Sequence, residues 1–212
     1  REHFREAIDT MLWGPINLAL AVLPGMRERG HGRIGTISSI GGRVAVPHLV
    51  PYSAAKFGAA GFTDGLRAEL AGTGVTATTV TPGLMRTGSH LRARFTGNAA
   101  AEYAWFAPGM AIPFVSIDAE RAARRIVDGV IDGDATVVLT PVAQAAIRAH
   151  GVAPGLTSFF MRQAGRLLPS PPDEPTDTVD GMVARSRLDS NLVDTVTAPA
   201  DRAARRTNEL AS

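Results

Sequence analysis

Three side chains able to support proton transfer stand near one another in the chain: Ser39, Tyr52 and Lys56. Tyr52 and Lys56 are four residues apart, and Pro51, which suits the first turn of a helix, directly precedes them. Positions i and i+4 share one face of a helix, so the phenol and the ammonium would lie side by side. The spacing therefore predicts a paired phenol and ammonium that Ser39 can approach from a neighbouring element.

A phenol, an ammonium and a hydroxyl together support a defined chemistry. A tyrosine phenol titrates near pH 10, and an adjacent ammonium favours its ionised form. A phenol tuned in this way can give a proton to a carbonyl oxygen as hydride reaches the carbon, or take a proton from an alcohol. Ser39 would hold the same oxygen by a hydrogen bond.

An ordinary surface pair has the same Tyr-x-x-x-Lys spacing, so the pattern by itself leaves two interpretations open. Lys56 is the only lysine among 22 basic residues, the others being arginine. The pKa of an ammonium responds to its surroundings, whereas a guanidinium stays charged, so the two do not substitute freely. The use of lysine at this position favours the catalytic interpretation.

Helical and strand patterns alternate around these residues. Apolar spacing, turn residues and β-branched runs predict, in order, a helix, a strand, a helix, a strand, a helix and a strand, over residues 4–29, 33–39, 52–71, 75–81, 119–132 and 135–140. Strands separated by helices need right-handed crossovers and form a parallel sheet, so the fold class is α/β. Ligands bind at the carboxyl ends of such strands, where Ser39 and Pro82-Gly83 fall.

The stretch between Gly88 and Asp118 shows no clear period and is rich in aromatic residues. Long loops of this kind are often functional, which favours a lid over an apolar pocket; a loop packed on the domain surface is the alternative. We expect Tyr103, Trp105 and Phe106 to contact the substrate.

Residues after Pro141 return to a helical pattern, with an apolar stripe from Leu156 to Leu168. Packing on its own domain or on a second copy is favoured over binding to a membrane surface. Residues 170–175 read as a linker, and residues 176–212 are polar and expected to be poorly ordered. The expected organisation is 1–140, a helical extension at 141–169 and a tail at 170–212.

The stretch from Ser39 to Tyr52-Ser53-Ala54-Ala55-Lys56 resembles the active-site region of the short-chain dehydrogenase/reductase family, and Pro82 to Thr87 is similar to its Pro-Gly-x-x-x-Thr segment. The resemblance covers about residues 3 to 140. It implies the C-terminal half of a Rossmann-like, doubly wound parallel sheet, with three strands, followed by the helical extension. It also implies an oxidoreductase that interconverts an alcohol and a carbonyl on a small apolar substrate.

The resemblance assigns roles residue by residue. Tyr52 becomes the general acid/base, Ser39 the partner of the substrate oxygen, and Lys56 also a ligand of the nicotinamide ribose. Thr87 and the backbone after Pro82-Gly83 would hold the nicotinamide carboxamide. The residues expected to bind NAD or NADP are Tyr52, Lys56, Pro82, Gly83, Leu84 and Thr87.

Two departures from the family pattern stand out. Met11 occupies the position where the family usually has a catalytic asparagine, and methionine cannot hold a water as an amide does. Asn17 lies on a different helix face. The chain also lacks the glycine-rich turn that holds the pyrophosphate, so we expect a truncated, inactive piece in which NAD and NADP cannot be told apart.

Composition narrows the remaining classes. The net charge is +2, which provides no strong field for nucleic acid, and no apolar run long enough to span a bilayer is visible. No cysteine occurs, which fits a reducing cytoplasm, and the five scattered histidines predict no metal site.

Three functional hypotheses follow. The first is the oxidoreductase, which the resemblance expects to form a homodimer or homotetramer when full length. The second, motivated by Met11, is a catalytically weak cofactor-binding or regulatory protein of the same fold. The third treats the C-terminal helix as an interaction module for a partner or a membrane surface.

Overall fold

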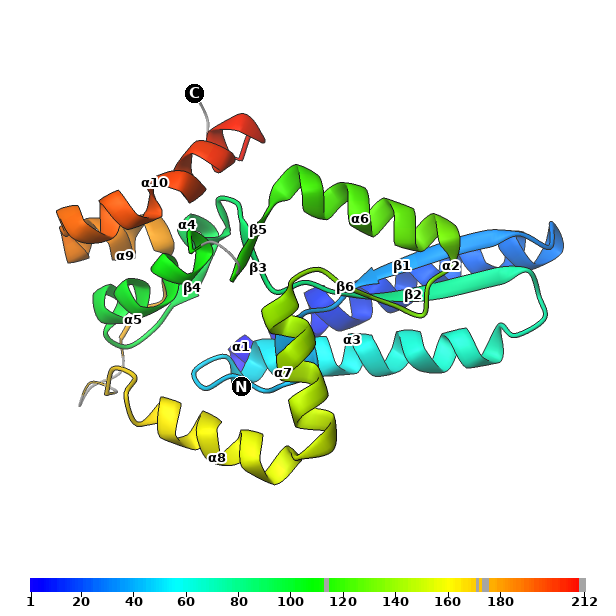
Figure 1. The fold of residues 1–212 in the computed structure, drawn as a ribbon, viewed down its shortest axis with the longest axis horizontal. Helices are drawn as coiled ribbons and strands as arrows, with labels where there is room; N and C mark the ends of the chain where they lie inside the picture. The colour runs from blue at the N-terminus through cyan, green and yellow to red at the C-terminus, as the bar shows by residue number, and fades with distance from the viewer. Residues whose placement is uncertain (113–114, 171, 173–175, 210–212) are drawn as a thin grey trace. The chain divides into compact units, whose positions relative to one another are not determined.

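The structure, a computed structural model, describes residues 1–112, 115–170, 172 and 176–209, which form two compact units. The first unit contains Arg1–Gly83 and Ala123–Gln163, and the second contains Leu84–Ala122 and Ala164–Ser212 (Figure 1). This division differs from the expected boundaries at 140 and 170, because the C-terminal segment belongs with residues 84–122 rather than forming a separate tail.

A three-stranded parallel sheet forms the centre of the first unit, in the order β1-β2-β6. Its strands are β1 (Gly32–Ile37), β2 (Val75–Thr81) and β6 (Thr136–Val138). Ile37 pairs with Val80, and Val80 pairs with Val137, so the carboxyl ends of the strands meet at one edge. The predicted α/β class and its three parallel strands are confirmed.

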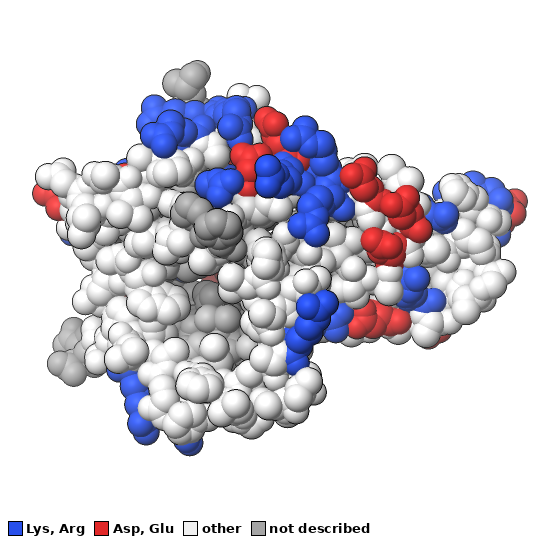
Figure 2. Space-filling model, in the orientation of Figure 1, with Lys and Arg blue, Asp and Glu red and all other residues white. Residues whose placement is uncertain are grey.

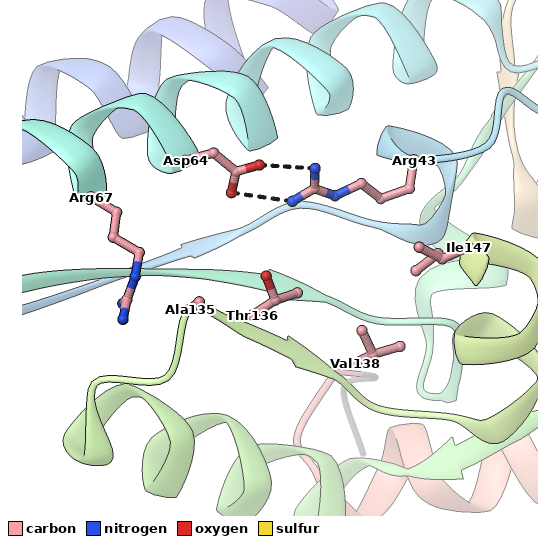
Figure 3. Close-up of a pocket in the computed structure, with 7 residues that line it drawn as sticks. All are labelled: Arg43, Asp64, Arg67, Ala135, Thr136, Val138 and Ile147. Carbon is pink, nitrogen blue, oxygen red and sulfur yellow. Dashed lines mark hydrogen bonds and ion pairs between the residues drawn. The ribbon is translucent and has the colours of Figure 1, made fainter. Parts of the chain in front are cut away.

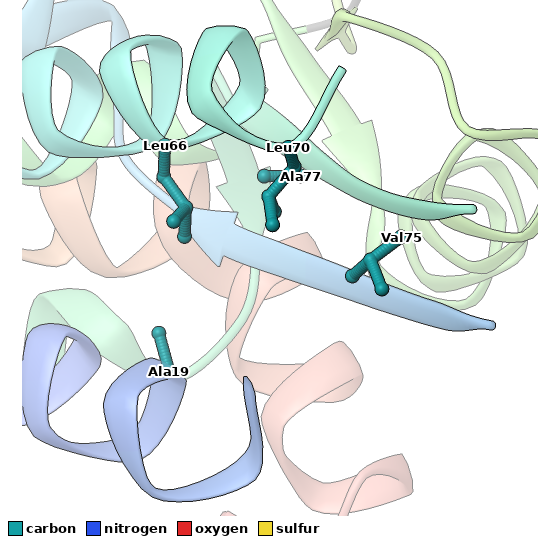
Figure 4. Close-up of a cluster of buried hydrophobic side chains, with 5 residues drawn as sticks. All are labelled: Ala19, Leu66, Leu70, Val75 and Ala77. Carbon is teal, nitrogen blue, oxygen red and sulfur yellow. The ribbon is translucent and has the colours of Figure 1, made fainter. Parts of the chain in front are cut away.

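Helices cover both faces of this sheet. On one face, α2 (Gly14–Glu28) and α3 (Val50–Glu69) pack with β2 in a buried cluster (Figure 4), whose members are Ala19, Leu66, Leu70, Val75 and Ala77. On the other face, α6 (Ala119–Asp132) lies so close to β1 that a side-chain carbon on Gly35 would overlap Val130. Alternating strand residues thus meet different helices, as the period of a strand requires.

The first helical run is interrupted by one π-helical turn, η1 (Asp9–Trp13), between α1 (Glu2–Ile8) and α2. Over Glu2–Glu28 this run is long and apolar enough to cross a membrane, judged by length and composition only, so the expectation that no such run exists is wrong. Prolines and glycines interrupt the apolar residues of this segment in the sequence. In the structure its backbone is nevertheless helical without a gap from Glu2 to Glu28. Core helices of soluble proteins pass the same test, which makes the finding weak support for a membrane span.

Two further helices end the first unit: α7 (Pro141–Val152) and α8 (Pro154–Gly165), of which the last residues fall in the second unit. No residue of α8 is buried, and Leu156, Phe159 and Phe160 are exposed. Residues 141–170 contain no Asp or Glu, and Figure 2 shows no acidic side chain over α8. Of the predicted apolar stripe, the members on α8 are thus not buried, whereas Leu168, beyond the end of the helix, is buried.

The second unit is assembled from short elements around β3 (Leu84–Arg86) and β5 (Ser116–Asp118), which pair in parallel. Residues 88–118, expected to be a loop without a clear period, contain several of these elements: α4 (Ser89–Arg92), β4 (Arg94–Phe95), α5 (Ala99–Phe106) and the 3₁₀ turn η3 (Ala107–Met110). Asn98 caps α5 by accepting a hydrogen bond from the Ala101 amide.

The C-terminal segment is folded, in contrast to the poorly ordered tail that its polarity suggested. It forms β7 (Val179–Asp180), α9 (Gly181–Leu188) and α10 (Asn191–Arg206), and β7 pairs with β4. Asp180 and Ser190 cap the two helices. Small residues explain the docking, since Ala184 is fully buried in one cluster with Phe95, Ala99, Tyr103 and Ala107. Most of the predicted linker, residues 171 and 173–175, lies outside the described residues.

Candidate active site

Ser39 lies two residues after Ile37, the last residue of β1, and caps the 3₁₀ turn η2 (Ile40–Gly42). Its backbone is extended, and its hydroxyl accepts a hydrogen bond from the Gly41 amide at 3.1 Å. This contact caps the turn and fixes the hydroxyl at the carboxyl edge of the sheet. The prediction that Ser39 lies at a strand end is thus correct.

Tyr52 and Lys56 stand on the first two turns of α3, with Pro51 at the start of the helix. The ammonium Nζ of Lys56 lies 5.8 Å from the centre of the Tyr52 ring and donates a hydrogen bond of 2.8 Å to the Ile37 carbonyl. Since an ammonium has three donors, this contact leaves donors on the same side chain for a ligand.

The phenol of Tyr52 hydrogen-bonds to the side chain of Ser39. Burial raises the pKa of Tyr52 above its ordinary value, and the hydrogen bond with Ser39 lowers it in part. Burial also lowers the pKa of Lys56. Burial rather than attraction by the ammonium dominates the titration of Tyr52, contrary to the expectation from sequence, so the phenol keeps its proton at neutral pH.

The glycines after Ser39 allow the loop to approach α3 closely. A side-chain carbon on Gly41 would lie 3.1 Å from the Tyr52 ring, and one on Gly42 would overlap the Lys56 backbone and the Ser38 hydroxyl. That hydroxyl donates to the Lys56 carbonyl at 2.8 Å. Sequence reasoning missed Ser38 and Gly42; the Ser-Ser and Gly-Gly doublets flanking Ile40 were the available signal.

Pro82 and Gly83 lie beside the same loop, because the Ile40 amide donates to the Pro82 carbonyl at 2.8 Å. A side chain on Gly83 would overlap the hydroxyl of Thr140. The structure therefore brings Ser39, Tyr52, Lys56 and the Pro82-Gly83 turn together in the first unit.

The other predicted site residues belong to the second unit. Leu84 begins β3, and the Thr87 hydroxyl lies 2.8 Å from the hydroxyl of Ser89. Tyr103 is fully buried against Phe95, at a ring-centre distance of 5.9 Å, which makes it a core residue of that unit.

The remaining two aromatic residues differ in exposure. The side chain of Trp105 is 47% exposed, whereas Phe106 is partly buried against Phe95. A role for either in substrate binding stays a prediction.

Met11 lies in the π-helical turn η1 and is half-buried, while Asn17 is exposed on α2. Single π turns occur often at functional sites, where they change the direction of a helix face. Met11, which departs from the family pattern, thus lies in a turn where the helical backbone is also irregular.

A hollow of the first unit lies elsewhere (Figure 3). It measures about 390 Å³ and is lined by Arg43, Asp64, Arg67, Ala135, Thr136, Val138 and Ile147. Asp64 pairs with Arg43 at 2.9 Å and accepts from Thr79, and Arg67 donates to the carbonyls of Ala77 and Gly133. Because the charged side chains that line it bond to one another and to the backbone, we interpret this hollow as part of the packing of the unit and not as a ligand site. Across the described ranges, no three His, Cys, Asp or Glu side chains are grouped to hold a metal.

Comparison with known proteins agrees with this geometry. The model of the short chain dehydrogenase family matches residues 1–95. The acetoacetyl-CoA reductase of Paracoccus denitrificans is 43% identical over 86 residues, covering 41% of this chain and 36% of the reductase.

Two solved structures are similar in fold. A short-chain dehydrogenase from Streptomyces avermitilis has a TM-score of 0.59 and 28% identity, covering 77% of this chain and 62% of the other. A short chain dehydrogenase from Burkholderia cenocepacia, solved in complex with NADP, has a TM-score of 0.53 and 25% identity, covering 79% and 60%.

The family model, the named relatives and the solved structures together support membership of the short-chain dehydrogenase/reductase family. It spans about a third to a half of the length of the curated relatives that it matches.

Proposed function

We propose that the protein containing this chain is an NAD(P)-dependent oxidoreductase that interconverts an alcohol and a carbonyl on a small apolar substrate. The hydrogen-bonded pair of Tyr52 and Ser39, with Lys56 one turn along α3, carries the proposal. The acetoacetyl-CoA reductase among the relatives supports the carbonyl class of substrate.

The residues of the first unit fit a nicotinamide cofactor through the chemistry of their donors. Lys56 has ammonium hydrogens beyond the one given to Ile37, suited to ribose hydroxyls, and Pro82-Gly83 offers backbone beside the Ser39 loop. The bound, reduced cofactor supplies a hydride to the carbonyl carbon and is thereby oxidised. The choice between NAD and NADP stays open; the NADP complex of the Burkholderia protein supports NADP.

In this proposal Ser39 donates a hydrogen bond to the carbonyl oxygen and Tyr52 transfers its phenol proton to that oxygen, which completes the alcohol. The negative charge left on the phenol oxygen is stabilised by the ammonium of Lys56. In the oxidative direction the phenolate takes the hydroxyl proton. The raised pKa of Tyr52 supports the reductive role at neutral pH, since the phenol is then protonated.

The test is a Tyr52→Phe variant of the full-length protein, assayed with NADH and NADPH against a panel of ketones. We expect kcat to fall by about 100- to 10,000-fold, the usual contribution of general acid catalysis, with cofactor binding retained. Thr63→Val, a buried hydroxyl further along α3 that bonds only within the helix, is the matched control and should keep its kcat. Equal turnover in wild type and Tyr52→Phe would eliminate the proposed acid.

A second candidate function is a cofactor-binding or regulatory protein with weak catalysis, favoured by Met11 in the π-helical turn. The same assay separates the two, because cofactor binding by wild type without oxidation of cofactor by any ketone would favour the second. We further propose that the oxidoreductase is a cytoplasmic homodimer or homotetramer. The exposed Leu18, Leu20 and Phe57 on α2 and α3 support contact with a second copy.

A further inference from the structure

A buried network in the second unit joins the C-terminal helices to the segment that follows β3. In Figure 1, α9 and α10 lie beside α4 and β4. We propose that His90 and Asp201 are positioning residues, through which the C-terminal helices fix Thr87 for cofactor binding. The inference rests on the proposed function and on the role that the family resemblance implies for Thr87, which is to hold the nicotinamide carboxamide.

His90 is fully buried, and each of its ring nitrogens faces an oxygen atom. Nδ1 lies 3.1 Å from the Thr87 carbonyl oxygen, and Nε2 lies 3.0 Å from Oδ1 of Asp201. The Thr87 carbonyl and the Asp201 carboxylate can each only accept, so a ring nitrogen makes either contact as the donor of a hydrogen. The ring is thus held at both ends, and its orientation sets the position of the peptide between Thr87 and Gly88.

Asp201 is itself fixed from the other side. Its Oδ2 accepts a hydrogen bond of 2.9 Å from Arg185 of α9, and the Nε of Arg185 donates to Asp194 at 2.6 Å. Both oxygens of the Asp201 carboxylate are therefore engaged, one by the histidine and one by the guanidinium. Charge-assisted hydrogen bonds of this kind are about twice as strong as neutral ones. The Asp201 carboxylate is therefore held firmly in one position.

The turn after Thr87 makes two more contacts with the C-terminal segment, one with Glu209 beyond the end of α10 and one with Gly181 of α9. The carboxylate of Glu209 accepts a hydrogen bond of 2.9 Å from the Gly88 amide. Gly181, at the start of α9, lies against the backbone of His90 so closely that any side chain there would overlap it. The C-terminal segment thus contacts the backbone of residues 88–91 at two points, through Glu209 and through Gly181.

The consequence concerns Thr87. Its carbonyl is bound by His90 while its hydroxyl, paired with Ser89, remains on the outside of the network. The Ser89 amide also donates to the Thr87 hydroxyl at 3.3 Å, so backbone and side chain of Thr87 are both held and less conformational entropy is lost when a ligand binds the hydroxyl. The helices of the tail would then determine cofactor affinity without touching cofactor or substrate.

The experiment measures NADPH affinity of the full-length protein by cofactor fluorescence, together with kcat. We expect Asp201→Asn, which keeps the volume and removes the charge, to weaken NADPH binding by about 10-fold, the effect of about 1.4 kcal/mol. Asp194→Asn is the matched control: it removes the other carboxylate that binds Arg185, from the same helix, without contact to His90. It should leave NADPH affinity unchanged.

A second pair of variants separates positioning from packing. Asn at position 90 can place an amide hydrogen where Nδ1 lies, whereas Gln reaches toward the Nε2 position, so His90→Asn should bind NADPH more tightly than His90→Gln. The comparison of the NADPH affinities of the two His90 variants tests the inference even where Asp201→Asn does not fold. Equal weakening by Asp201→Asn and Asp194→Asn, or equal affinity of the two His90 variants, would overturn the inference. Absence of NADPH binding by wild type would instead refute the proposed function.

Discussion

Tyr52, Ser39 and Lys56 come from two elements of the first unit. The side chain of Ser39 bonds to the Tyr52 phenol, and the Lys56 ammonium lies 5.8 Å from the Tyr52 ring centre and donates to Ile37 at the end of β1. Their environment is partly buried, which raises the pKa of the phenol and lowers that of the ammonium. Both shifts favour the less charged form of each group. A protonated phenol beside a hydroxyl donor suits a site that gives a proton to a developing oxygen anion.

The raised pKa of Tyr52 predicts the pH dependence of the two reaction directions. Reduction needs the protonated phenol, so its kcat should stay level through neutral pH and fall as the pH rises through the pKa of Tyr52. Oxidation needs the phenolate and should increase over the same alkaline range. Steady-state rates of the full-length protein from about pH 6 to about pH 11 check this. A reductive rate that climbs toward alkaline pH would contradict it.

Among the elements, α5 and α9 show how the second unit is stabilised. Tyr103 of α5 is fully buried beside Ala184 of α9. Among the described residues no hydrogen bond of good geometry reaches its hydroxyl, which interacts with the Arg185 side chain. Burial, with smaller effects from Arg185 and two carboxylates, raises the pKa of Tyr103 to about 12. The ring supplies the packing, and the hydroxyl is only weakly bonded.

We therefore expect Tyr103→Phe to change stability by no more than about 1 kcal/mol at neutral pH, because the lost hydroxyl makes no hydrogen bond of good geometry. The folded-state pKa lies above the ordinary value of 10.0, so the contribution of Tyr103 is present below pH 10.0 and is lost as the pH rises toward about 12. The variant should show a weaker alkaline loss of Tm. Destabilisation by several kcal/mol at neutral pH would mean that the hydroxyl makes a strong hydrogen bond.

At the scale of the whole molecule, β1 is an edge strand of the sheet, and the described residues offer it no second neighbour. Ile37 at its end is 44% exposed. In the proposed function the first unit holds the nicotinamide end of the cofactor, and the 212 residues contain no glycine-rich turn of the kind that binds a pyrophosphate.

The 212-residue chain by itself is accordingly expected to show no turnover and to bind NADPH at least about 100-fold more weakly than the full-length protein, a difference of about 2.8 kcal/mol. Titration of both proteins by cofactor fluorescence measures the ratio. Circular dichroism of the isolated chain serves as the control for folding. Similar affinities of the two proteins would show that the pyrophosphate contacts contribute little.

The amino-acid sequence determined the parallel sheet, the position of Ser39 at a strand end and the pairing of Tyr52 with Lys56, because these depend on local periodicity and on the geometry of strand–helix–strand units. Only the tertiary structure showed that the C-terminal segment, from residue 176 to residue 209, is folded. His90 and Asp201 are 111 positions apart, and no periodic pattern links them. The tail is polar overall, and its composition alone suggests disorder. It folds because Ala184 packs against residues 95–107 and because the network of Arg185 and Asp201 binds His90, and these contacts are not visible in the local composition.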